Sequence, residues 1–303
     1  MSSNQPTENL VTGGDRLRDW KAILQSSRKQ MKLDRVNVAA GAFAYRWFLS
    51  LFPMIIALLG ITTLITIPRH VVVSLLHGVT KALPSGAAQV FTVAISHATQ
   101  RSGTDIGTTV IASVVALWSA TSGMVIVEEG LDMAYDLPTD RTFLDKRLVA
   151  LPLLFAAAVL GGAASALIIF GPQLGGLIKA AVPDGGAVFA IVWTILRWIL
   201  ALALMNLLIS FLYFLAPNRH RMKWRWTSAG ALFATIVWAL VSLGFSFYTS
   251  NFGSYGTTYG AFAGVAILIF WLYLTGLAIL MGGEVDAAAE RRDAGTPSHT
   301  TNG

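Results

Sequence analysis

The sequence predicts an all-α membrane protein, a polytopic bundle of about six transmembrane helices. Two observations support this fold class. Of the 303 residues, 54% are hydrophobic and only 13% are charged, whereas soluble domains carry roughly 25% charged residues, mostly on their hydrated surface. Long apolar runs also recur along the chain, and a run of about 20 apolar residues is what an α-helix needs to cross the hydrocarbon core.

Six apolar runs reach this length. Because backbone polar groups within hydrocarbon must be hydrogen-bonded inside their own segment, each run is expected to be a helix. The predicted spans are residues 47–67, 106–127, 148–170, 188–215, 227–248 and 260–283. The chain is thereby divided into an N-terminal segment (1–46), a transmembrane domain (47–284) and a disordered tail (285–303).

The distribution of Lys and Arg predicts the orientation, because positively charged loops are retained in the cytoplasm. The N-terminal segment, the loops after the second and fourth spans and the tail together hold 17 of the 22 Lys and Arg residues. The opposite loops hold 4, and Arg197 lies inside the fourth span. We therefore expect a multi-pass protein of the bacterial inner membrane with both termini in the cytoplasm.

Two segments between or before the spans are predicted to be amphipathic. Residues 15–35 mix apolar side chains with basic ones, which is typical of a helix on the anionic inner leaflet or, equally, of a solvated helix packed on the bundle. Residues 70–100 read as two short helices broken at a Pro-Ser-Gly sequence. Small residues at every fourth position, such as Ala157, Gly161 and Ser165, predict close helix packing in the third span.

Composition excludes several kinds of chemistry. The chain has no cysteine, which excludes disulfides, thiolate metal sites and a cysteine nucleophile. The five histidines show no spacing typical of a metal site, and no nucleotide-binding motif is present. We therefore predict no metal, no cofactor and no nucleic-acid partner, and an enzyme is not expected.

Arg197 is the most informative single residue. A charge near the middle of the membrane costs about 2.5 to 3.5 kcal/mol on insertion scales, so something must compensate it. One interpretation is that Arg197 faces water and holds an anionic headgroup by bidentate contact. The other is a structural arginine that snorkels, or that is satisfied by carbonyl groups and neighbours such as Asn206.

Carboxylates cluster at the predicted cytoplasmic ends of two spans. Glu128 and Asp132 share one face of a helix because they are four residues apart, and Glu129 lies between them. We expect these three to pair with Arg141, Lys146 and Arg147, and Glu284 to pair with Arg219, Arg221, Lys223 or Arg225. The tentative substrate-binding residues are Arg197, Asn206, Glu128, Asp132 and Glu284.

Several short segments, in order, resemble the YihY/BrkB family of bacterial inner-membrane proteins, once labelled ribonuclease BN. The similarity covers roughly residues 30–290. The segments are Ala44-Tyr45, Leu49 to Pro53, Glu129 to Arg147 with Ala134-Tyr135 and Arg141, Tyr213 to Arg219 (YFLAPNR), Tyr259-Gly260 and Gly282 to Ala287. The resemblance implies a six-helix membrane fold. It also implies, through a YhjD branch linked to export of lipopolysaccharide precursors, a lipid transporter.

The leading functional hypothesis is a transporter or flippase of a lipid or another anionic amphiphile. The alternative is a non-transporting scaffold that maintains the envelope, and a membrane hydrolase comes third. The expected partners are membrane lipids and, as a further possibility, other copies of the chain in a homo-oligomer.

Overall fold

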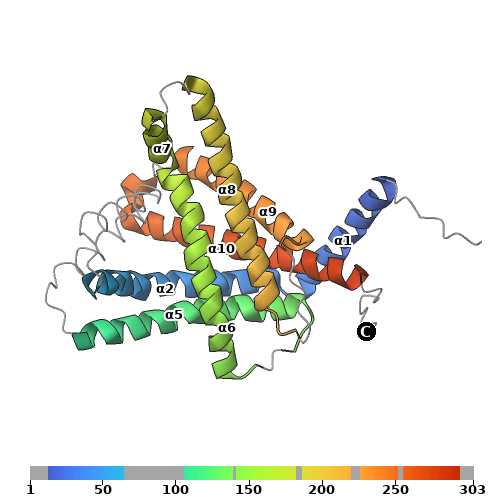
Figure 1. Cartoon of the computed structure of the whole chain (residues 1–303). Coiled ribbons are helices and arrows are strands. Elements are labelled where there is room, and N and C mark those ends of the chain that lie inside the picture. Colours follow the sequence, from blue (N-terminus) through green and yellow to red (C-terminus); the bar gives the residue numbers. More distant parts are fainter. Residues whose placement is uncertain are drawn as a thin grey trace, which may run out of the picture.

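A computed structural model describes residues 13–64, 106–138, 141–181, 186–219, 226–251 and 255–293. All regular elements in these ranges are helices (Figure 1). The elements are α1 (Gly13–Leu33), α2 (Val36–Leu64), α5 (Ile106–Ala134), α6 (Phe143–Ala156), the π-helical turn η1 (Ala157–Gly161), α7 (Gly162–Ala181), α8 (Gly186–Leu215), α9 (Ala229–Asn251) and α10 (Tyr255–Asp293). The predicted all-α class is confirmed.

Four stretches of the described helices are long and apolar enough to cross a membrane. They are Phe143–Gly176, Val188–Leu215, Ala229–Tyr248 and Gly264–Arg292. They coincide with the last four predicted spans, and the first of them runs through α6, η1 and α7 without interruption. Helices α2 and α5 coincide with the first two predicted spans, and their passage through the membrane stays a prediction.

Two helices continue beyond the predicted apolar runs where their ends are buried, and the predicted disorder from residue 285 is wrong. Helix α2 begins at Val36, well before residue 47, since Val36 and Ala40 lie in the core. The tail that we expected to be disordered from residue 285 is helical as far as Asp293, because Val285 and Ala287 are buried. The predicted short helices in residues 70–100 lie outside the described residues.

One end of the bundle gathers the polar side chains. Helices α2, α5, the continuous α6–α7 helix, α8, α9 and α10 alternate in direction. As a result, α2, α6 and α9 begin at the end of the bundle where α5, α8 and α10 end (Figure 1). We call this end the polar end; it is the side predicted to face the cytoplasm. Helix α2 packs on α5 and α10, α9 packs on α8 and α10, and the α7–α8 hairpin extends away from α2 and α5.

Helix α1 packs against α10 at the polar end. Ser27 of α1 is fully buried, and its hydroxyl donates to the backbone oxygen of Glu284 at 3.3 Å. Of our two interpretations of this segment, packing on the bundle is what the structure shows for this half of α1. Leu24 and Leu33 remain exposed, so contact of their face with the membrane surface stays a prediction.

The closest helix contact lies between α9 and α10. A Cβ added at Gly230 would overlap the carbonyl oxygen of Gly282 and lie 2.8 Å from the backbone nitrogen of Asp286. Only glycine at 230 lets the two backbones approach this closely. The small-residue repeat of the third span makes a looser contact, in which a Cβ at Gly161 would lie 3.6 Å from Leu208.

We predict that Gly230→Ala destabilises the protein, because the added methyl meets backbone atoms that cannot move aside. The expected loss is about 1 to 3 kcal/mol, the usual cost of overpacking, measured as a lower melting temperature of the purified protein in detergent. Gly244→Ala is the matched control on α9, since nothing lies within 4 Å of its added Cβ. Equal melting temperatures for the two variants would contradict the close contact.

Candidate functional site

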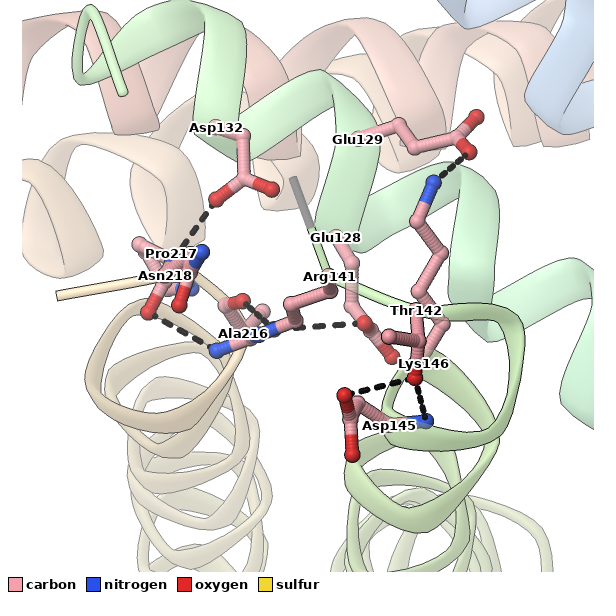
Figure 2. A network of polar contacts seen from close by, with 10 residues as sticks. All are labelled: Glu128, Glu129, Asp132, Arg141, Thr142, Asp145, Lys146, Ala216, Pro217 and Asn218. Carbon is pink, nitrogen blue, oxygen red and sulfur yellow. Dashed lines mark hydrogen bonds and ion pairs between the residues drawn. The ribbon is translucent and has the colours of Figure 1, made fainter. Parts of the chain in front are cut away.

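The last two turns of α5 bring two carboxylates into the interior at the polar end. The side chains of Glu128 and Asp132 are only 1% and 2% exposed. They lie on the same face of α5, as their spacing predicts. Figure 2 shows both pointing from α5 toward Arg141 and the segment that follows α8. Buried carboxylates are tolerated only where charged or hydrogen-bonding partners reach them.

Arg141 is the main partner of this group. Its Nη1 lies 3.3 Å from Oε2 of Glu128 and donates to the carbonyl oxygen of Ala216 at 2.6 Å. Its Nη2 donates to the carbonyl oxygen of Pro217 at 3.3 Å (Figure 2). The guanidinium therefore joins the end of α5 to the end of α8, where exposed carbonyls and the helix dipole favour a cation.

Asp132 completes the junction between α5 and α8. Its Oδ1 accepts a hydrogen bond of 2.7 Å from the backbone nitrogen of Asn218. The loop that precedes α6 is held in place as well, because the hydroxyl of Thr142 accepts from the backbone nitrogen of Asp145 as an N-cap. Glu128 thus links α5 to Arg141 in the loop before α6, and Asp132 links α5 to the segment after α8.

The predicted pairing of the α5 carboxylates is confirmed for two of three cations. Arg141 pairs with Glu128, and Lys146 pairs with Glu129 at 2.7 Å in a partly exposed position. Arg147 instead donates to the backbone oxygen of Trp118 at 2.9 Å and to the hydroxyl of Thr121 at 2.6 Å, and its guanidinium stacks on the Trp118 ring. The prediction that Arg147 pairs with a carboxylate is therefore wrong, because its position on α6 lies next to Trp118 and Thr121, which precede the carboxylates on α5.

A second polar chain joins α5, the end of α8, α9 and α10. The hydroxyl of Tyr135 donates to Asp286 at 2.7 Å, which also accepts from the backbone nitrogen of Gly230 at 3.0 Å. Arg219 lies over the Tyr135 ring at 4.3 Å and pairs with Glu290 at 2.7 Å. The sequence reading missed Tyr135, Asp286 and Glu290 as partners. The sequence did contain one signal: Asp286 and Glu290 are four residues apart, which places them on one face of α10.

Glu284 does not pair with Arg219 as predicted. Its side chain is fully buried, and neither carboxyl oxygen meets a hydrogen-bond donor among the described residues. The reason is helical geometry, since two residues along an α-helix correspond to a rotation of about 200°. Asp286 therefore faces α9 whereas Glu284 faces α1. The other predicted partners, at residues 221, 223 and 225, lie outside the described residues.

Arg197 lies apart from the polar end. It is 11 residues into α8, about 16 Å from the start of the helix, and we expect this depth to be near the middle of a hydrocarbon core of about 30 Å. Its Cδ lies against Gly171 of α7, where an added Cβ would be only 2.8 Å away. Within the described ranges Arg197 forms no ion pair, and its Nε is buried without a hydrogen-bond partner.

Asn206 belongs to a third location. Its side-chain nitrogen donates to the hydroxyl of Thr235 at 3.2 Å, and its oxygen accepts from the hydroxyl of Thr227. It is nine residues from Arg197, about 14 Å along α8. The five residues that we predicted as one set are therefore spread over separate places: Arg197 at mid-helix, Asn206 between α8 and α9, and Glu128, Asp132 and Glu284 at the polar end.

We predict that Arg141→Ala is strongly destabilising, because it breaks the buried pair with Glu128 and removes the hydrogen bonds to the carbonyl oxygens of Ala216 and Pro217. The expected loss is about 3 to 5 kcal/mol. Lys146→Ala removes the partly exposed pair with Glu129 and should cost about 0 to 1 kcal/mol. Thermal unfolding of both variants in detergent measures the difference. If the two substitutions had the same effect, the buried pair would not be the main link between α5 and α8.

Three comparisons with known proteins bear on identity. The chain is 35% identical over 251 residues to the ribonuclease-like protein YfkH of Bacillus subtilis (strain 168), covering 82% of this chain and 88% of that protein. It is 28% identical over 277 residues to a UPF0761 membrane protein of Vibrio campbellii, covering 90% and 83% of the two chains. No solved structure gives a significant match. The family model described as virulence factor BrkB matches residues 27–302, and the chain therefore belongs to the BrkB family of membrane proteins.

Proposed function

We propose that this protein is a transporter that moves a lipid or another anionic amphiphile across the inner membrane, with Arg197 as the residue that binds the anionic group. The single observation that carries the proposal is the position of Arg197. A permanently charged side chain lies about 16 Å along the apolar helix α8, a depth that we expect to be near mid-membrane, and no described carboxylate neutralises it. Charged side chains at this depth are rare and mark substrate or ion pathways.

The immediate surroundings of Arg197 favour a binding role over snorkelling. The side chain is half-buried and lies against Gly171 of α7. The ring nitrogen of Trp193, one turn away, donates to the carbonyl oxygen of Gly171 at 2.6 Å. These contacts direct the guanidinium along the α7–α8 interface. A guanidinium has five donors in a planar fork that suits phosphate and carboxylate groups, so its remaining donors are available to a headgroup.

The opposite face of α8 is suited to lipid contact. Ile191, Ile195 and Ile199 are each more than half exposed, and at about 100° per residue they lie roughly opposite Arg197. An amphiphile at this hairpin would therefore have its charged group near the α7–α8 interface and its tails in the surrounding hydrocarbon. This separation of polar and apolar parts is what movement of a lipid headgroup through a membrane requires.

The helix that carries Gly171 also has a place where it can bend. The π-helical turn at 157–161 interrupts the regular hydrogen bonding between α6 and α7, and Pro152 and Pro172 lie on either side of it. Such turns and prolines are the usual causes of helix kinks, and π turns occur often at functional sites. Bending there would move the outer part of α7 relative to the firmly linked polar end.

The test is movement of a fluorescent anionic phospholipid in liposomes that contain the purified protein. A membrane-impermeant reductant bleaches label only in the outer leaflet, so bleaching beyond that fraction reports transbilayer movement. We expect the native protein to accelerate movement of labelled phosphatidylglycerol. Arg197→Ala should slow it about ten- to hundredfold, since charge-assisted hydrogen bonds contribute about 1.5 to 3 kcal/mol. Arg197→Lys should be intermediate, because it keeps the charge without the fork.

Arg28→Ala is the matched control. It removes one positive charge from the exposed surface of α1 and should leave lipid movement unchanged. Native protein that moves label no faster than empty liposomes would contradict the transporter and favour the scaffold. Equal slowing by Arg197→Ala and Arg28→Ala would contradict the assignment of Arg197, because a general effect of net charge would then explain the result.

A further inference from the structure

Two carboxyl groups meet where α1, α2 and α10 come together. Asp34 lies in the short turn between α1 and α2, and its carboxyl group lies next to that of Glu284 on α10. Glu284 is 0% exposed. Within the described residues, neither oxygen of Glu284 nor Oδ2 of Asp34 meets a conventional hydrogen-bond donor. The hydroxyl of Ser27 is close by, yet its hydrogen-bond acceptors are the backbone oxygens of Ile23, at 2.8 Å, and of Glu284, at 3.3 Å.

The chemistry of such a pair requires a proton. An ionised carboxylate has only acceptor atoms, so two ionised carboxylates cannot hydrogen-bond to each other. Neighbouring carboxyl groups away from water instead share one proton, because two like charges at this separation cannot both be stabilised. The polar network around Arg141 does not supply the missing positive charge, since that cation is used by Glu128 and by the end of α8.

We propose that Asp34 and Glu284 form a proton-binding site, and that the bound proton holds α1 against α10. With the proton present, one carboxyl donates to the other and links the two helices. When the proton leaves, two negative charges face each other across the same contact and α1 separates from the bundle. The site is distinct from Arg197 and does not depend on the transport activity proposed above.

The charged groups around the pair do not replace the proton. Asp136, just after α5, adds a negative charge, and Arg291 of α10 adds a positive one. Arg291 is already paired with Asp136 at 2.8 Å, and Gln30 of α1 donates to the same carboxylate at 3.3 Å. Arg35, the neighbour of Asp34 in the chain, is exposed. The helix α2 contributes the apolar residues Val36 and Ala40 from its first turns.

Burial gives the direction of the pH response. It raises the pKa of Asp34, the contact with Glu284 lowers it, the charge of Asp136 raises it and that of Arg291 lowers it, and the net effect is an increase. A carboxyl whose pKa is raised in the packed state stabilises that state at low pH, and the stabilisation is lost as pH rises through the raised pKa. Packing of α1 should therefore weaken on the alkaline side.

The backbone has an unusual conformation in the turn between α1 and α2 and in the turn after α5. Arg35 and Asp136 have φ angles of 49° and 53°, and they are the two non-glycine residues with positive φ in the described part of the chain. The left-handed region is unfavourable for a side chain such as that of arginine. Arg35 follows Asp34 directly, and Asp136 is one of the charged groups around the pair. The packing around the site therefore holds both turns in this conformation.

The experiment measures the distance between α1 and α5 as a function of pH. The chain has no cysteine, so Lys29→Cys on α1 and Met133→Cys on α5, both exposed, can carry spin labels on the full-length protein. We expect one short distance at about pH 5 and a second, longer population as pH rises to about 10, because buried carboxyls titrate within this range. Infrared spectra of the same samples should show a protonated carboxyl band that disappears in parallel.

Asp34→Asn and Glu284→Gln test the residues, since an amide can donate the missing hydrogen bond without a proton. Each should keep the short distance up to the highest pH and remove the infrared change. Asp34→Asn is at the less buried position and keeps the test valid if Glu284→Gln does not fold. Glu129→Gln, which changes a carboxylate paired with Lys146, should leave the transition in place.

The proposal is overturned if the native distance stays the same over the whole pH range. It is also overturned if Asp34→Asn keeps the full pH response, because a different group would then bind the proton. Failure of lipid transport in liposomes would leave this result unaffected, since the distance between helices is read in detergent without any substrate.

Discussion

The structure depends on one constraint, the lack of hydrogen-bond partners within hydrocarbon. Helices that cross the membrane satisfy their own backbone, so nearly all charged side chains must gather at helix ends. At the polar end, Arg141 meets this constraint by joining Glu128 on α5 to the free carbonyl of Ala216 at the end of α8. Asp286 plays a similar part between Tyr135 and α9. The end of the bundle is thereby fixed by buried ionic contacts.

Arg197 is the exception to this distribution, and its position relates the fold to the proposed function. At the polar end Arg141 and Arg219 each form an ion pair, whereas Arg197 in the α7–α8 hairpin forms none among the described residues and its Nε has no hydrogen-bond partner. The polar end is held by ion pairs, whereas the α7–α8 hairpin follows a π-helical turn. This arrangement allows the hairpin to move relative to the polar end. The carboxyl pair of Asp34 and Glu284 adds a third feature, a contact of α1 that responds to protons.

The sequence predicted the helices better than the sites, for a physical reason. Hydropathy and the basic loops depend on contact with the surrounding solvent, so the apolar runs mark the long helices. The pairing of Glu128 with Arg141 followed from their nearness in sequence. Of the predicted partners of Glu284, Arg219 pairs with Glu290 instead, because the rotation of α10 turns Glu284 toward α1 and sequence nearness to basic residues carries no information on rotation. Asp286 was missed because its partners, Tyr135 and Gly230, come from distant segments.

The central claim is that the guanidinium of Arg197 lies in a hydrated path between helices at mid-membrane. The most direct measurement is the reaction of single cysteines on α8, in a chain that has no other cysteine, with a charged thiol reagent that does not cross the membrane. The account predicts that Arg197→Cys reacts in reconstituted protein, whereas Ile199→Cys, on the exposed apolar face of α8, does not react. Arg197→Cys that is as unreactive as Ile199→Cys would contradict it.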